Sequence, residues 1–183
     1  MAESDILRDA ETRMKKSVEA AASDFATLRT GRATPAMLDP VKVEYYGQQM
    51  PINQLASVTV PEPRTLIIAP WDRGTLGPIE KAILRSDLGL NPNNDGEVIR
   101  LNIPMLTEER RKDFVKQLNG KAENARVSVR NIRRDAIDQA KKDEEMTEDD
   151  VKRLEKDVQK LADKYIGEID TLQKSKEGEL MEV

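Results

Sequence analysis

The sequence contains neither cysteine nor histidine among its 183 residues. The absence of both excludes disulfides, thiolate chemistry, zinc fingers and the common catalytic triads. Aromatic residues are also scarce, at 3% of the chain, whereas 35% of the residues are charged and 38% are hydrophobic. This composition favours exposed amphipathic helices over an aromatic-rich globule. The length indicates one large domain or two small ones.

Long apolar segments and enzymatic motifs are missing as well. No apolar run approaches the roughly 18 residues of a membrane helix, and the N-terminus has no signal-peptide core. The sequence contains no phosphate-binding loop, no dinucleotide-binding glycine pattern and no nucleophile elbow. We therefore expect a cytoplasmic protein with no membrane partner, no catalytic residue, no metal site and no cofactor.

One acidic stretch, Glu144 and Glu145 with Glu148, Asp149 and Asp150, allows two interpretations. Its carboxylates could hold a divalent cation, or they could form a solvated loop followed by a helix start. Neither the spacing nor the glycine content matches an EF-hand, so the second interpretation is favoured.

The prolines divide the chain into three parts. All nine lie between Pro35 and Pro104, and residues 1–30 and 105–183 contain none. Because proline interrupts helices, the proline-free parts are expected to be helical and the middle to be shorter and more turned.

Apolar residues in the proline-free parts recur every three or four positions, the seam of antiparallel helices in a bundle. Ser4 or Asp5 is expected to cap the first helix, and Thr147 the third. A second helix from Thr107 to near Lys142 would be roughly 50 Å long at about 1.5 Å per residue. The three apolar stripes are as follows: Leu7, Ala10, Met14, Val18, Ala21, Phe25 and Leu28; Phe114, Leu118, Ala122, Ala125, Val129, Ile132, Ala136 and Ala140; Val151, Leu154, Val158, Leu161, Tyr165, Ile169 and Leu172.

The middle part has strand-like patterns instead. Residues 41–45 and 58–60 alternate apolar and polar side chains, residues 64–69 form a short apolar run, and residues 98–103 form a last strand after a turn at 91–96. A short helix is expected around Ile79 and Ile83. Alternation places one ring of Tyr45 and Tyr46 inward and the other outward.

These patterns predict an α+β protein. An elongated antiparallel three-helix bundle, residues 1–30 and 105–183, is interrupted by a small mixed β/α/β domain, residues 31–104. The chain crosses between them near 30–35 and 103–106. Because the three stripes can cover one another, we expect a monomer.

Charge is distributed unevenly along this acidic chain, whose net charge is −4. Residues 105–142 carry 11 basic and 6 acidic side chains, whereas residues 143–183 carry 7 and 14. No acid lies between Asn124 and Arg134. Arg126, Arg130 and Arg133 fall within about 60° on one helical face, with Lys112 and Lys116 near the same stripe.

Two interpretations of this arginine face are open. It could be a solvated face partly neutralised by the acidic third helix, since surface ion pairs are common and weak. Alternatively, guanidinium groups that no carboxylate interleaves suit a phosphate backbone. The scarcity of aromatics argues against base stacking, so the second interpretation predicts contact with structured nucleic acid.

Two further segments draw attention. In residues 28–35, Gly31 can take a positive φ and end the first helix, and Pro35 prevents its continuation. Arg29 and Arg32 flank this crossing, either as part of the cap or as a ligand site. Trp71 follows a buried strand and is expected to pack in the core, with a partner anchor as the alternative.

Several segments, spread in order over the whole chain, resemble bacterial ribosome recycling factors. They are residues 28–35 (Leu-Arg-Thr-Gly-Arg-Ala-Thr-Pro), 44–47 (Glu-Tyr-Tyr-Gly), 81–83 (Lys-Ala-Ile), 86–92 (Ser-Asp-Leu-Gly-Leu-Asn-Pro), 106–111 (Leu-Thr-Glu-Glu-Arg-Arg) and 129–135 (Val-Arg-Asn-Ile-Arg-Arg-Asp). The resemblance implies an L-shaped molecule of near-tRNA dimensions with a flexible two-strand hinge.

The resemblance also implies a function. Such a factor enters the ribosome after termination and lies against large-subunit ribosomal RNA. Elongation factor G with GTP then drives the subunits apart, so that mRNA and deacylated tRNA leave. The resemblance assigns RNA contacts to Arg130 and Arg133, and extends that surface to Arg29, Arg110, Arg126 and Arg134. It assigns the hinge to Gly31, Arg32, Thr34, Pro35 and Pro104.

Two other functions compete with this one. A noncatalytic helical adaptor or chaperone-like module would use its heptads to pair with a partner chain. An enzyme would use a carboxylate-bound Mg²⁺. The sequence favours the translation factor, because the three helical stripes suffice to cover one another and no active-site motif is present.

Overall fold

The computed structural model describes residues 2–182, which form two compact units. Of the described residues, one unit comprises 2–30 and 107–182, and the other comprises Gly31–Leu106. The first is helical and the second contains every strand of the described chain.

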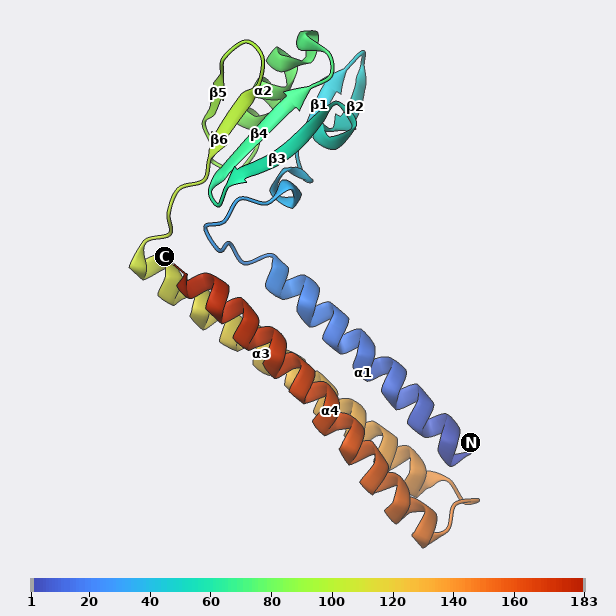
Figure 1. Cartoon of the computed structure of the whole chain (residues 1–183). Helices are drawn as coiled ribbons and strands as arrows, with labels where there is room; N and C mark the ends of the chain where they lie inside the picture. The colour runs from blue at the N-terminus through green and yellow to red at the C-terminus, as the bar shows by residue number, and fades with distance from the viewer. Residues whose placement is uncertain (1, 183) are drawn as a thin grey trace. The chain divides into compact units, whose positions relative to one another are not determined.

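Three long helices form the first unit: α1 (Glu3–Ala26), α3 (Glu108–Lys142) and α4 (Glu148–Met181). The chain turns back between α3 and α4, and α1 lies alongside both, so α3 runs antiparallel to the other two (Figure 1). The predicted stripes form most of the core, with Met14, Leu118 and Val158 fully buried. At two positions the adjacent residue is buried instead: Ile6 in place of Leu7, and Ala162 in place of Leu161. The prediction of three packed amphipathic helices is confirmed.

The helix starts follow from their caps. The Thr107 hydroxyl accepts from the Arg110 N–H at 3.2 Å, and the Thr147 hydroxyl accepts from the Asp150 N–H at 3.1 Å. The Asp150 carboxylate accepts in return from the Thr147 N–H at 3.1 Å, which completes a capping box. The predicted cap of the first helix is wrong: α1 begins after Ala2, with no side-chain cap.

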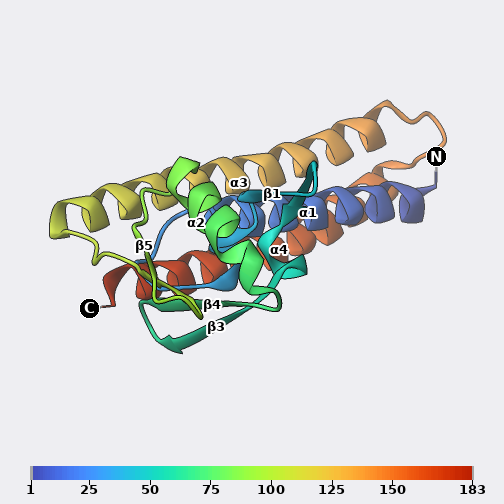
Figure 2. The same cartoon turned by 90° about the horizontal axis from the view of Figure 1, so that it is seen from above.

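The second unit is built on a four-stranded antiparallel sheet in the order β3 (Ala56–Glu62), β4 (Thr65–Pro70), β6 (Ile99–Asn102) and β5 (Pro92–Asn94). The helix α2 (Leu76–Arg85) covers one face of this sheet (Figures 1 and 2). The core between them includes Leu66, Ile68, Ile79, Ile83 and Leu101, each fully buried. The helix α2 and the strands β3, β4 and β6 thus form where their patterns predict.

A hairpin of β1 (Lys42–Tyr45) and β2 (Gln48–Pro51) completes the second unit, together with three short 3₁₀ turns at Pro35–Leu38, Ile52–Gln54 and Arg73–Thr75. Tyr46 and Gly47 both have positive φ, 49° and 76°, as a tight two-residue hairpin turn requires. Tyr46 is 87% exposed and Tyr45 is half-buried, as the alternation predicts.

Two predictions about this unit are wrong. Residues 91–96 are not all turn, because Pro92–Asn94 pair with β6 as an edge strand and only the residues after them turn. Trp71 is not a core residue, since it is 70% exposed. It follows the end of β4, and its N–H donates to the Leu55 carbonyl at 3.2 Å.

Candidate nucleic-acid interface

The arginines of α3 differ in their surroundings. The Arg126 side chain is only 17% exposed, and its Nε donates to Asp170 on α4 at 2.8 Å. A second guanidinium nitrogen of Arg126 donates to Gln173, also on α4. Arg126 therefore connects two helices of the bundle. It is a packing residue first, and at this position α4 neutralises the arginine face, as the first of the two interpretations predicts.

Glu123 joins Arg126 to Arg130. Its carboxylate accepts from Arg126 at 3.2 Å and from Arg130 at 3.0 Å. These two hydrogen bonds, that of Arg130 first, lower the pKa of Glu123 from its usual value. The expectation that no carboxylate interrupts the arginine face is wrong here, because Glu123 lies one residue before the acid-free segment.

Unlike Arg126 and Arg130, neither Arg133 nor Arg134 is paired with a carboxylate among the described residues. Arg133 donates to the neutral side-chain oxygen of Gln159 on α4 at 2.8 Å. Arg134 is exposed and makes no ion pair or side-chain hydrogen bond within residues 2–182. The arginines of α3 therefore range from Arg126, which is paired at the α4 edge, to Arg134, which faces solvent without a partner among the described residues.

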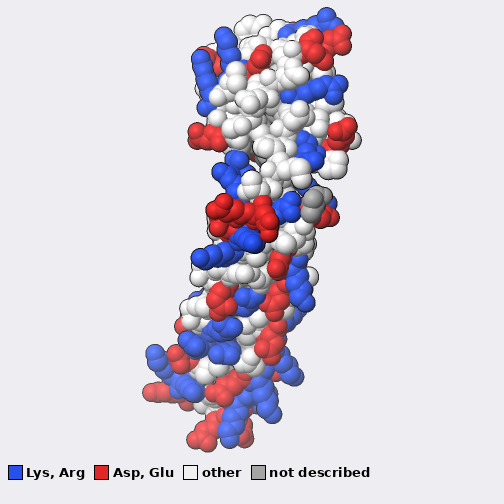
Figure 3. Space-filling model, turned by 90° about the vertical axis from the view of Figure 1, so that its left-hand side faces the viewer, with Lys and Arg blue, Asp and Glu red and all other residues white. Residues whose placement is uncertain are grey.

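The other predicted basic residues lie near the ends of the helices. Arg29 and Arg110 are exposed, and neither guanidinium has a partner among the described residues. Lys112 pairs with Glu108 at 3.4 Å. Lys116 is exposed and has no ion-pair partner among residues 2–182. On the face that Figure 3 shows, basic and acidic side chains interleave along the bundle. Unpaired cations are thus separate points on a mixed surface.

The predicted hinge residues lie at the two chain crossings. Gly31 has a φ of +76°, as predicted, but α1 ends at Ala26, before that glycine. A hydrogen bond of 2.7 Å from the Ala33 N–H to the Pro63 carbonyl fixes the first crossing to the second unit. Thr34 precedes the 3₁₀ turn that Pro35 opens, so both already belong to that unit.

The second crossing is fixed in the same way. The Ile103 N–H donates to the Arg64 carbonyl at 2.8 Å, directly before the exposed Pro104. Arg32 is also exposed. The chain leaves the second unit at Gly31 and Leu106, which approach each other: a Cβ on Gly31 would lie 3.5 Å from Leu106 Cγ.

The acidic stretch before α4 forms a loop and a helix start, as predicted. Asp150 belongs to the capping box, and Asp143 accepts from the Glu145 N–H at 2.9 Å. Within residues 2–182, no three acidic side chains gather into a metal-binding group. No helix in that range combines the length and apolarity of a membrane span.

Comparison with known proteins connects this geometry to a family. Residues 21–181 match the family model described as "Ribosome recycling factor". The chain is 57% identical to the ribosome-recycling factor of Carboxydothermus hydrogenoformans over 182 residues, covering 98% of each chain. It is 53% identical to that of Deinococcus radiodurans over 176 residues, covering 96% of each.

Solved structures agree. A solution structure of a ribosome recycling factor is 46% identical, with a TM-score of 0.80 and coverage of 100% of this chain and 99% of the other. A second structure describes the T. thermophilus ribosome recycling factor and the E. coli elongation factor G bound to the E. coli post-termination complex. It matches over 100% of both chains at 48% identity, with a TM-score of 0.65. The chain therefore belongs to the ribosome recycling factor family.

Proposed function

We propose that this protein, with elongation factor G and GTP, splits the post-termination ribosome into subunits and so releases mRNA and deacylated tRNA for a new round of initiation. The observation that carries the proposal is the full-length similarity, at 48% identity, to a recycling factor described together with elongation factor G on a post-termination complex. The chain acts in the cytoplasm, where it performs no catalytic step and needs no cofactor. Elongation factor G supplies the nucleotide hydrolysis.

The bundle docks on large-subunit ribosomal RNA through α3. Arg134, Arg130 and Arg133 contact phosphates, and the unpaired guanidiniums of Arg29 and Arg110 extend the surface. Arg126 contributes by holding α3 against α4, because its hydrogen bonds with Asp170 and Gln173 occupy it. Phosphate contacts of this kind fix register and orientation rather than read sequence.

The hinge is narrower than the sequence suggests. Thr27 and Leu28 are still hydrogen-bonded to the end of α1, and Thr107 caps α3. Because Ala33 and Ile103 are hydrogen-bonded into the second unit, the pivot falls on residues 29–32 and 104–106. Thr34 and Pro35 anchor the pivot on the side of the small domain. A pivot of a few residues lets that domain move as a body.

A subunit-splitting assay with and without elongation factor G and GTP tests this function. Splitting by the wild type is expected only when both are present. Arg134→Ala and Arg133→Ala are each expected to weaken binding to large subunits and to lower the slope of log affinity against log salt by about one. Lys160→Ala, which removes an exposed α4 cation, is the matched control. Absence of splitting by the wild type would refute the function, and unchanged affinity and slope in both arginine variants would refute the docking surface.

A further inference from the structure

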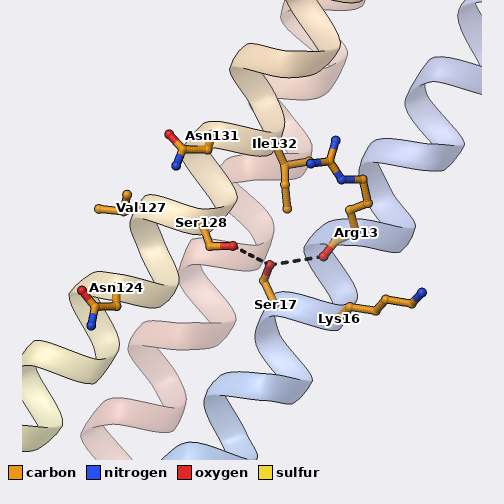
Figure 4. A pocket seen from close by; sticks show the side chains of 8 residues that line it. All are labelled: Arg13, Lys16, Ser17, Asn124, Val127, Ser128, Asn131 and Ile132. Atoms are coloured by element: carbon orange, nitrogen blue, oxygen red, sulfur yellow. Dashed lines mark hydrogen bonds between the residues drawn. The ribbon is translucent and has the colours of Figure 1, made fainter.

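A shallow groove runs between α1 and α3, away from the α4 edge that Arg126 occupies. It consists of two adjoining hollows of about 460 Å³ and 720 Å³, which share Lys16, Ser17, Asn124 and Ser128 in their linings. Figure 4 shows the first hollow, where Ser17 and Ser128 meet across the groove at 2.9 Å. Alanine side chains line the second, so that a ligand backbone can approach closely: Ala20, Ala21 and Ala125.

One basic side chain that lines the groove, Lys16, has no ion-pair partner among the described residues. Lys121 is paired with Asp24 at 2.7 Å, and Arg13 with Asp135 at 3.1 Å. Lys16, on the α1 wall, is exposed and has no partner among residues 2–182. Asp24 is the one carboxylate among the lining residues of the two hollows, and Lys121 already neutralises it, which favours an anionic or strongly polar occupant.

A row of side chains leads from this groove to the free arginine. Asn124, Val127, Asn131 and Arg134 follow one another along α3 in steps of three, four and three residues, and such residues are neighbours on a helix surface. Figure 4 shows the first three of these positions on consecutive turns. No acidic residue stands between these four positions. Asp135, one turn past Asn131, is paired with Arg13 at 3.1 Å, and Asp138 lies one turn past Arg134, beyond the end of the row.

The chemistry of the row suits RNA. Neither asparagine amide has a hydrogen-bond partner among the described residues, so each offers two donors and one acceptor. Amides of this kind can bind sugar hydroxyls and base edges, and the 2′-hydroxyl distinguishes RNA from DNA. Val127, 42% exposed between them, is a small apolar surface for a ribose face.

We propose that the α1–α3 groove and the row of Asn124, Val127, Asn131 and Arg134 bind the ribose–phosphate edge of folded RNA. Lys16 and Arg134 contact phosphates at the two sides, and the two asparagines hydrogen-bond sugars between them. This inference rests on the proposed function and extends the RNA surface around α3, from its α4 side to its α1 side. A partner helix would need more exposed apolar area than Val127 provides.

Salt-dependent binding to large ribosomal subunits tests this proposal. Asn124→Ala/Asn131→Ala is expected to weaken affinity by about three- to tenfold per residue with an unchanged salt slope, because neutral groups release no counterions. The control is Thr171→Ala/Ser175→Ala, a pair of exposed neutral side chains one turn apart on α4, and it should bind like the wild type. Both pairs should keep the wild-type helical circular dichroism, since alanine favours helices.

The proposal is overturned if the asparagine pair binds as tightly as the wild type, or if both pairs weaken binding equally. Failure of the proposed function is a separate result, in which the wild type itself does not split ribosomes. A second measurement uses the absence of cysteine, which makes an introduced thiol unique. An iron chelate on the thiol of Val127→Cys should cleave large-subunit RNA, and one on Lys160→Cys should not. Absence of cleavage from the first overturns the proposal.

Discussion

Arg126 and Arg134 lie two turns apart on α3, yet their side chains have opposite surroundings. Arg126 is 17% exposed between Glu123, Asp170 and Gln173, whereas Arg134 is exposed and unpaired within the described residues. Hydrogen bonds to charged groups contribute about 1.5–3 kcal/mol each to the free energy of unfolding. Substitutions of exposed side chains rarely change that free energy by more than about 0.5 kcal/mol. Arg126→Ala is therefore expected to lower the free energy of unfolding by about 1–3 kcal/mol in urea titrations, and Arg134→Ala by less than about 0.5 kcal/mol. Equal losses would show that Arg126 is also a surface residue.

Tyr165 is the second residue whose environment sets its chemistry. It is buried in the bundle, and its hydroxyl donates to Glu11 at 2.8 Å. Burial and the Glu11 carboxylate raise the pKa of Tyr165 to about 12. Because the folded pKa lies above the unfolded value of about 10, the neutral ring stabilises the fold below pH 10. This contribution is lost as the pH rises toward 12.

Tyr165→Phe tests that linkage. The variant should lose about 1 kcal/mol of unfolding free energy at neutral pH, because the hydrogen bond to Glu11 is gone. Its stability should then fall less steeply than that of the wild type between pH 10 and 12. Chemical denaturation at several pH values measures both quantities. Parallel stability curves over that interval would contradict the assignment of Tyr165 as the titrating group.

At the scale of elements, the start of α4 depends on one reciprocal pair. Hydrogen bonds from the Thr147 N–H and hydroxyl lower the pKa of Asp150 from its usual value. A lowered folded pKa means that the cap stabilises the fold above about pH 4, and that this contribution is lost as the pH falls through the folded pKa. Thr147→Ala should cost about 1 kcal/mol at neutral pH.

Asp150→Asn removes the negative charge of this cap but keeps a side chain of nearly the same shape, so it tests the contribution of the charge alone. The variant should be less stable than the wild type at pH 7, and the difference should shrink as the pH falls below about 4. Asp149→Asn, in the same exposed first turn, is the control and should leave the acid limb of the stability curve unchanged. Equal acid sensitivity in the wild type and Asp150→Asn would remove Asp150 as the source.

Helices and strands in which apolar residues recur at a regular spacing could be predicted from the sequence. The apolar stripes through Met14, Val129 and Leu154 are buried as expected, because a three- or four-residue spacing allows only one buried face. The edge strand at Pro92–Asn94 could not be predicted, since its residues resemble a turn and only pairing with β6 makes them a strand. Trp71 was misassigned for a related reason, because its exposure depends on where β4 ends.

The candidate interface could be predicted only in part. Helical counting brings Arg130, Arg133 and Arg134 to neighbouring positions, and counting one residue further back would have found Glu123. The partners of Arg126 on α4 could not be found in that way. Asp170 and Gln173 are set by the register between two antiparallel helices, which depends on side-chain packing and has no local sequence signal.

At the scale of the whole molecule, each unit has a core of its own. Ile68, Ile79 and Ile99 are buried within Gly31–Leu106, and Met14, Leu118 and Leu154 within the bundle. The second unit enters and leaves at neighbouring residues, Gly31 and Leu106. A domain whose ends lie together can be inserted into or removed from another fold at little cost to either core.

Replacing residues 31–106 by a short glycine–serine linker tests the division of labour between the units. The bundle should retain its helical circular dichroism and a cooperative thermal transition, because α1, α3 and α4 pack against one another without the insert. Since the proposed RNA surface lies wholly on the bundle, the shortened chain should still bind large subunits with the salt slope of the full chain. It should not split ribosomes, because the proposed function requires the small domain to move about its pivot. Loss of subunit binding by a folded bundle would mean that the second unit contributes to docking, and would assign RNA contacts beyond α1 and α3.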